Sequence, residues 1–180
     1  MKKIILVLIG FAVLGFTPQK ESAFDVGEQF VFRVHYQFVQ AGYATLEIKE
    51  AIINKKKVFK VIGKGYTTGV SRFFFKVDDT FESYIDKETG SPYQYVRKTD
   101  EGGYTKNQEG FFNPSENKVL VKDYKHNTEK TFSIPKNTQD ILSSFYYLRN
   151  YPNIDKMKVG EFVAIDMFFD DKTTKFRLKF

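Results

Sequence analysis

Alternating apolar and polar residues recur along most of the chain and predict a protein built mainly of β-strands. In residues 28–39 the apolar side chains take the even positions from Phe30 to Phe38, with Arg33 and His35 between them. A period of two is typical of a strand with one buried and one solvated face. Further strands are predicted at residues 44–49, 58–66, 72–86, 93–105, 118–125, 130–135, 161–169 and 175–180.

One segment has helical spacing instead. Its apolar residues recur every three or four positions, at Ile141, Leu142, Phe145 and Leu148. Asn137 or Thr138 is expected to cap this helix, with Asp140 in the first turn and Arg149 in the last, where the helix dipole favours each charge. The predicted fold is therefore mainly β: one strongly curved antiparallel sheet, or a barrel-like sheet, with a single packed helix near residues 138–151.

The alternation also predicts which side chains form the core. Lysines 55–57 after Asn54 are expected in a hairpin turn, and Gly63 and Gly65 are expected to mark a bend or bulge. We expect Arg33, His35, Glu47 and Lys56 to be exposed. We expect the following side chains to be buried: Phe32, Tyr36, Leu46, Phe75, Phe81, Ile141 and Phe145.

The N-terminus has the pattern of a secretory signal. Lys2 and Lys3 precede an uninterrupted apolar run at residues 4–16, which is too short to span a bilayer as a helix. A buried N-terminal helix is the alternative interpretation. We expect residues 1–23 to be a signal peptide with an uncertain cleavage point, residues 24–180 to form a single β-rich domain, and the mature protein to be periplasmic or secreted.

Composition and charge argue against several classes of protein and partner and exclude others. The chain has no cysteine, which excludes a disulfide framework and a lipid anchor on an N-terminal cysteine. Its formal charge is +6 and is scattered along the sequence, so nucleic acid is not an expected partner. After signal cleavage we do not expect an integral membrane protein. Residues 175–180 are predicted to form a strand that ends with the chain, whereas a barrel needs every strand edge paired or covered. We therefore expect a chain truncated at its C-terminus.

Several segments resemble a known family. They are residues 25–30 with 42–44, residues 75–79 with 82–86, Arg97 with residues 101–104, and residues 139–143 with 147–149. Together they resemble exported bacterial proteins grouped as domain of unknown function family 3108. The resemblance implies a secreted or periplasmic β-rich domain of Gram-negative bacteria, without an assigned activity.

Residues with catalytic or metal-binding chemistry are few. The two histidines, His35 and His126, are expected to be solvated and lie in no triad-like context. Without cysteines or a dense acidic loop, no metal or cofactor is expected. Residues 69–73 lack the second glycine of a nucleophile elbow, and residues 63–65 lack the rest of a phosphate loop.

One polar cluster is predicted from strand register. If the turn at residues 86–91 closes a symmetric hairpin, pairing Phe81 with Arg97, then Asp79, Arg97, Thr99 and Glu101 share one face among aromatic side chains. A charge in such surroundings must be paired or solvated. The cluster is interpreted as an ion pair of Arg97 with Asp79 or Glu101 that fixes the register, or as the polar floor of a ligand cleft.

Three functions remain open at this point. The first is a non-catalytic binding or scaffolding domain of the cell envelope, and the second is a carrier of an apolar envelope molecule such as a lipid. The third is a glycan hydrolase using Asp79 and Glu101, which is disfavoured because Arg97 beside them is expected to lower both pKa values. The expected partner is thus an envelope component or an apolar ligand.

Overall fold

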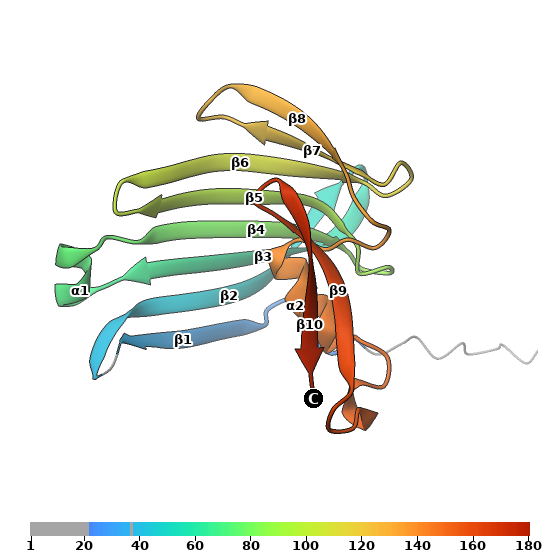
Figure 1. The fold of residues 1–180 in the computed structure, drawn as a ribbon, viewed down its shortest axis with the longest axis horizontal. Helices are drawn as coiled ribbons and strands as arrows, with labels where there is room; N and C mark the ends of the chain where they lie inside the picture. The colour runs from blue at the N-terminus through green and yellow to red at the C-terminus, as the bar shows by residue number, and fades with distance from the viewer. Residues whose placement is uncertain (1–21, 37) are drawn as a thin grey trace, which may run out of the picture.

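The protein is built on one antiparallel sheet whose strands follow one another in chain order. The computed structural model describes residues 22–36 and 38–180, and Figure 1 shows the arrangement. The eight strands of this sheet are β1 (Gln29–Tyr36), β2 (Val39–Ile53), β3 (Lys56–Thr67), β4 (Asp78–Asp86), β5 (Pro92–Glu101), β6 (Tyr104–Asn113), β7 (Lys118–Asp123) and β8 (Thr128–Ser133).

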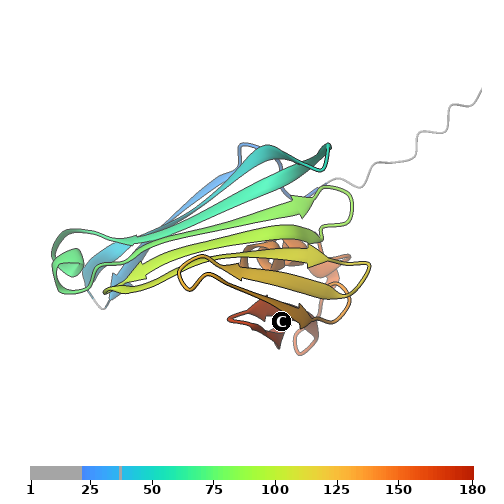
Figure 2. The same ribbon diagram turned by 90° about the horizontal axis from the view of Figure 1, so that it is seen from above.

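A second layer covers part of one face of this sheet. It consists of α2 (Ile141–Arg149) and a separate hairpin of β9 (Phe162–Phe169) and β10 (Lys172–Lys179), with the short η1 (Ile154–Lys156) between them. We call the face beneath this layer the packed face. A six-residue helix, α1 (Gly69–Phe74), lies at the opposite end of the long strands, as both views show (Figures 1 and 2).

Two buried clusters hold the layers together. In one, Phe24 and Tyr146 of α2 pack on sheet residues Ile48, Phe59, Val61 and Ile85. In the other, Phe168 of β9 packs on side chains from β5 to β8 and on Ile134. Both clusters lie beneath α2 or the β9–β10 hairpin. The core therefore lies between the sheet and the second layer.

The mainly β fold with one principal helix is confirmed, but the sheet is neither closed nor strongly curled. Its order runs from β1 to β8 without pairing between these two end strands. The predicted barrel-like closure is thus wrong. The second layer buries one face of an open sheet instead, which is an alternative way to form a core from the same alternating pattern.

Two strand predictions also need correction. Residues 72–86 do not form one strand, since Gly69, with φ of +54°, begins α1 and β4 starts only at Asp78. β6 was not predicted, because its first half is polar in sequence. The bulge expected at Gly63 and Gly65 is absent, as β3 keeps a regular register there with both neighbouring strands.

Several turns have the predicted chemistry. Asn54 and Lys55 adopt positive φ between β2 and β3, and Asp170 and Asp171 do so between β9 and β10. Two-residue hairpin turns favour such left-handed positions because these match the twist of the strands. The lysine-rich turn and the final hairpin were therefore correctly placed.

The predicted core list was mostly wrong. Phe32, Phe75, Ile141 and Phe145 are exposed, whereas Leu46 and Phe81 are half-buried. Arg33, His35 and Lys56 are exposed as expected, and Glu47 is half-buried. Outside the α1 region, the alternation identified which residues share a sheet face, but not which part of that face is covered. Tyr36 lies outside the residues whose side chains are described.

Asp140, rather than Asn137 or Thr138, caps α2. Its carboxylate accepts hydrogen bonds from the backbone N–H groups of Leu142 and Ser143, at 2.9 Å each, and the Ser143 hydroxyl accepts from the Asp140 N–H at 2.8 Å. This is a capping box with serine in the third position. Arg149 in the last turn forms an ion pair with Glu28 and donates to the Ala23 carbonyl, which ties the chain before β1 to the helix.

The expected signal peptide lies almost wholly outside the described residues. Within the described part of the chain, no helix is long and apolar enough to cross a membrane.

Candidate functional site

The four residues of the predicted polar cluster do share the packed face. Phe81 pairs with Arg97 and Ser83 with Tyr95, as the symmetric hairpin required. Val77, just before the start of β4, pairs with Glu101. The only departure is a bulge between Tyr84 and Ile85 near the turn. Asp79 and Thr99 therefore lie opposite each other, with Arg97 and Glu101 on either side of Thr99 along β5.

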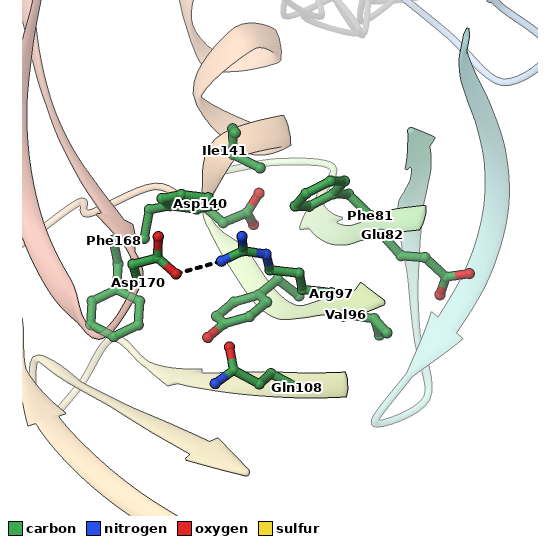
Figure 3. A pocket seen from close by; sticks show the side chains of 11 residues that line it. Phe81, Glu82, Val96, Arg97, Gln108, Asp140, Ile141, Phe168 and Asp170 are labelled. Atoms are coloured by element: carbon green, nitrogen blue, oxygen red, sulfur yellow. Dashed lines mark hydrogen bonds and ion pairs between the residues drawn. The ribbon is translucent and has the colours of Figure 1, made fainter. Parts of the chain in front are cut away.

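The partner of Arg97, however, was wrongly predicted. Its Nη1 lies 2.6 Å from Oδ1 of Asp170, in the turn of the β9–β10 hairpin, and Figure 3 shows the side chain extending from β5 toward that turn. Lys106 of β6 forms an ion pair with the same Asp170 oxygen. The Arg97 guanidinium also stacks 4.4 Å from the centre of the Phe169 ring. The ion pair thus holds the second layer on the sheet rather than fixing the β4–β5 register.

Electrostatics agrees with this assignment. Burial alone would raise the pKa of Asp170, but the hydrogen bonds from Lys106 and Arg97 outweigh it and hold this pKa below its ordinary value. Sequence reasoning missed Asp170 as a partner because it is 73 residues from Arg97 and nothing local indicates the contact.

Asp79 and Glu101 form a pair of carboxyl groups without a cation partner among the described residues. Burial raises the pKa of Asp79 most, and the neighbouring Glu101 carboxyl raises it further by its charge and a shared hydrogen bond. The Asp100 backbone N–H, 3.2 Å from Oδ1 of Asp79, acts in the opposite direction. The charge of Arg97 also lowers the Asp79 pKa, as expected, but this contribution is small, and burial together with Glu101 leaves the pKa above its ordinary value.

Two polar atoms of the cluster are buried without a hydrogen-bond partner within the described part of the chain. They are the Thr99 hydroxyl and Nε of Arg97, on residues that are 4% and 8% exposed. Buried polar groups are nearly always hydrogen-bonded in native proteins, so each such atom needs an explanation. Both belong to β5 on the packed face, where a bound polar group would satisfy them.

A small cavity adjoins this cluster beneath the second layer (Figure 3). About 20 Å³ of it is open to the centre of a water molecule, and its walls include Phe81, Tyr95, Gln108 and Asp140. Burial raises the pKa of Asp140 to about 6, although a 2.6 Å hydrogen bond from the Ser83 hydroxyl and the helix cap favour its carboxylate form. This volume suits one or two waters. A larger ligand has to bind outside it.

A line of residues on the packed face runs from its exposed part near Phe32 to the polar cluster. Strand pairing aligns one residue from each of six strands there, in the order Phe32, Ala44, Gly65, Asp79, Thr99 and Lys106. We call this line the cross-strand row. It begins with an exposed phenylalanine, passes over alanine and glycine, and ends at the polar cluster.

The middle of the row is hollow. A Cβ added at Gly65 would have only the Asp79 Cβ within 4 Å, at 4.0 Å, whereas one at Gly63 would meet Leu142 of α2 at 3.1 Å. Gly63 thus makes room for the helix, while Gly65 leaves open space above the sheet. Six strands at about 4.8 Å spacing give a row of about 24 Å. Period-two reasoning placed Asp79 and Thr99 on one face, but it did not include Lys106, because β6 was not predicted, and it could not show that Phe32 stays exposed whereas Thr99 is buried.

The remaining candidates have simple structural roles. Nδ1 of His126 lies 2.9 Å from the Asp123 carboxylate in the β7–β8 turn, and His35 is exposed on β1. Among the residues that the structure describes, no group of three or more potential ligand side chains could hold a metal ion. The feature that distinguishes the site is its apolar-to-polar surface.

The fold defines an antiparallel β-sheet domain, and comparison with known proteins identifies its family. Residues 31–180 match the family described as protein of unknown function (DUF3108), so the chain belongs to that family and the resemblance seen in its sequence is confirmed. None of the curated proteins and none of the solved structures compared with the chain matches it.

Proposed function

We propose that this protein is an exported, non-catalytic binding domain of the cell envelope that holds an amphipathic molecule along the cross-strand row. The observation that carries the proposal is the composition of that row. One end presents Phe32 and the other Asp79, Thr99 and Lys106, with a hollow over Gly65 between them. Ligand sites typically combine apolar walls with a few placed polar groups.

The apolar end extends beyond the row itself. Val34, two residues after Phe32 on β1, is 45% exposed on the same face, and the Phe30 ring stacks against Phe32 at 5.9 Å. Phe30 in turn contacts Phe145 of α2, which is also exposed. An apolar chain on the row would therefore lie against a continuous aromatic surface, and its burial contributes about 25 cal/mol per Å² of apolar area.

The polar end favours a ligand with a hydrogen-bonding group that is neutral or positively charged. Within the described chain the Thr99 hydroxyl has no hydrogen-bond partner, and Asp79 and Glu101 make no ion pair, although the nearby Arg97 charge lowers the Asp79 pKa somewhat. Lys106, in contrast, is already engaged by Asp170. A hydroxyl or amine at the end of an apolar chain would satisfy Thr99 and share hydrogen bonds with the carboxyl pair.

Glycan hydrolysis is less compatible with this geometry. Glycosidases keep their two carboxyl groups about 5–9.5 Å apart, so that a sugar and a nucleophile fit between them. Asp79 and Glu101 instead share a hydrogen bond. We therefore propose a binding role for the pair.

Binding is tested by filling the hollow. Gly65→Val places a branched side chain on the row in a strand position that valine favours. We expect this variant to fold normally and to bind the neutral apolar dye Nile red at least about 10-fold more weakly. Lys64→Val is the matched control, because Lys64 is the preceding residue and points to the opposite face of β3. Equal dye affinity in both variants would contradict the proposal.

The natural ligand is sought by native mass spectrometry of protein recovered from the cell envelope. The proposal predicts a co-purifying small molecule that is present with Lys64→Val and lost with Gly65→Val. N-terminal sequencing of the same material tests export, with an expected start between residues 16 and 24. A mature chain that still begins at Met1 would contradict export without affecting the binding result.

A further inference from the structure

The end of the molecule farthest from α2 carries a group of strongly exposed apolar side chains. They come from two regions that are separate in sequence: Phe38 in the turn after β1 with Val39, the first residue of β2, and Val70, Phe73 and Phe74 in α1. Phe38 is fully exposed, and Phe73 and Phe74 are 88% and 80% exposed. We call these five residues the apolar tip.

Hydrogen bonds hold the two regions side by side. The Thr68 backbone N–H donates to the Ala41 carbonyl at 3.0 Å, and the Ser71 hydroxyl lies 3.5 Å from the Gln40 carbonyl. Arg72 donates to the carbonyls of Thr67 and Val77, at 3.4 and 3.5 Å. No residue of α1 is buried. The apolar side chains are therefore not needed to form the tip, and they project from a base that is already fixed.

Behind the apolar tip lies a collar of charges of both signs. Arg72 forms an ion pair with Asp78, and Lys76 forms one with Asp100, each at 2.6 Å. Lys76 also lies 3.7 Å from Asp78. These four residues are exposed or half-buried, and their charges balance. The tip thus combines an apolar end with a neutral zwitterionic collar.

We propose that the apolar tip inserts into the surface of a phospholipid bilayer, with the collar at the level of zwitterionic headgroups. Large exposed apolar patches on soluble domains mark protein or membrane contacts. The tip is a projection at one end of the long axis (Figure 1), and a bilayer accepts a projection without a complementary shape.

The size of the apolar tip argues against a protein partner. Its three phenylalanines offer roughly 500 Å² of apolar surface, since a phenylalanine presents about 150–250 Å². A stable protein–protein interface needs about 800 Å² from each partner. The balanced collar likewise matches the mixed charges of zwitterionic headgroups rather than a strongly charged surface. This inference does not depend on the cross-strand row.

Tryptophan fluorescence tests insertion at one site, because the chain contains no tryptophan. Phe73→Trp places a reporter in the tip, and Phe176→Trp places one at an exposed position of β10 as the matched control. With vesicles of phosphatidylcholine and phosphatidylethanolamine, we expect the emission of Phe73→Trp to shift to shorter wavelength and to be quenched by brominated lipid. We expect the emission of Phe176→Trp to change in neither respect.

A second pair of variants measures the contribution of the tip. Adding Phe38→Ser and Phe74→Ser to Phe73→Trp should weaken vesicle binding at least about 10-fold, whereas adding Val159→Ser and Phe162→Ser, at exposed positions elsewhere, should not. An unchanged Phe73→Trp spectrum with vesicles would overturn the proposal. So would a blue shift that appears without lipid as the protein concentration rises, because that result would assign the tip to a second copy of the chain.

Discussion

The two ends of the sheet share one alternating sequence pattern but differ in what covers them. Beneath α2 and the hairpin, Ile48, Val61 and Ile85 are almost completely buried. Toward α1, Phe32 and Val34 occupy the same face and remain exposed. A period of two therefore shows which face a side chain is on, while the second layer decides whether that side chain is core or surface. Apolar residues that stay uncovered are available for binding.

The largest difference between the ends is expected in core truncations. Phe168 is 2% exposed and joins the hairpin to four strands, so Phe168→Ala should lower the free energy of unfolding by about 3–5 kcal/mol. Phe32→Ala, on the same face but uncovered, should cost less than about 1 kcal/mol. Chemical denaturation of both variants measures the contrast. Equal losses of unfolding free energy in the two variants would mean that the end of the sheet toward α1 also belongs to the core.

The next largest effect concerns Asp140 at the covered end. Its pKa of about 6 in the folded state exceeds the ordinary value of 3.8 because the side chain is buried. The folded state thus binds the proton more tightly, and stability should fall by about 3 kcal/mol as pH rises from about 4 to above 6. Asp140→Asn keeps the cap acceptor without the charge and should remove most of this pH dependence.

Melting curves from pH 4 to pH 8 for wild type and Asp140→Asn provide the measurement. Asp140→Ala removes the cap acceptor as well as the charge, so it should be about 1 kcal/mol less stable than Asp140→Asn at every pH. If wild type became more stable between pH 4 and pH 6 and Asp140→Asn did not, the carboxylate form would be the favoured one, and burial would not dominate at this position.

A smaller effect on the free energy of unfolding is expected at Arg97, which lies between the covered and the open end of the sheet. Its partner Asp170 keeps Lys106 and is 41% exposed at the side chain, so loss of the arginine leaves no buried unpaired carboxylate. Arg97→Met should therefore lower the free energy of unfolding by only about 1–2 kcal/mol, below the 3–5 kcal/mol typical of a broken buried pair.

A double-mutant cycle with Asp170→Asn isolates the Arg97–Asp170 contribution, and amide hydrogen exchange shows where it acts. Exchange in β9 and β10 should speed up in Arg97→Met, while β4 and β5 keep their protection. Faster exchange in β4 and β5 alone would restore the original hypothesis that Arg97 fixes the strand register.

The smallest effect is expected at the apolar tip. Phe73→Ser should change the free energy of unfolding by no more than about 0.5 kcal/mol, since this side chain is 88% exposed and α1 has no buried residue. A larger loss in chemical denaturation would show that the tip contributes to folding.

Local signals in the sequence were sufficient for much of the fold. The hairpin turns at Asn54 and Asp170, the pairing of Phe81 with Arg97 and the helix after Asp140 all follow from short-range patterns. The β6 strand was missed because a polar strand shows little alternation. The 72–86 strand was wrong because Phe73 and Phe75 fit a period of two, although residues 69–74 form α1 and belong to an exposed turn.

For the candidate site, the sequence identified Asp79, Arg97, Thr99 and Glu101 as one cluster but not what they contact. The Arg97–Asp170 ion pair joins residues 73 positions apart, so it depends on how the second layer docks. Gly63 and Gly65 were interpreted together as a bend or bulge. Only the position of α2 distinguishes Gly63, which admits the helix, from Gly65, which leaves open space. Whether the second layer covers a given part of the sheet depends on tertiary packing, which the periodicity of a strand does not show.

The central claim is that the uncovered cross-strand row, and not the apolar groove between α2 and the hairpin, binds an amphipathic ligand. That groove, lined by Ile165, Met167 and Leu178 among others, is the competing site. The most direct test is amide chemical-shift mapping by NMR during titration with pentaethylene glycol monododecyl ether below its micelle concentration. The account predicts saturable shifts at Phe32, Ala44 and Gly65. Shifts confined to β9 and β10, or none at all, would contradict it.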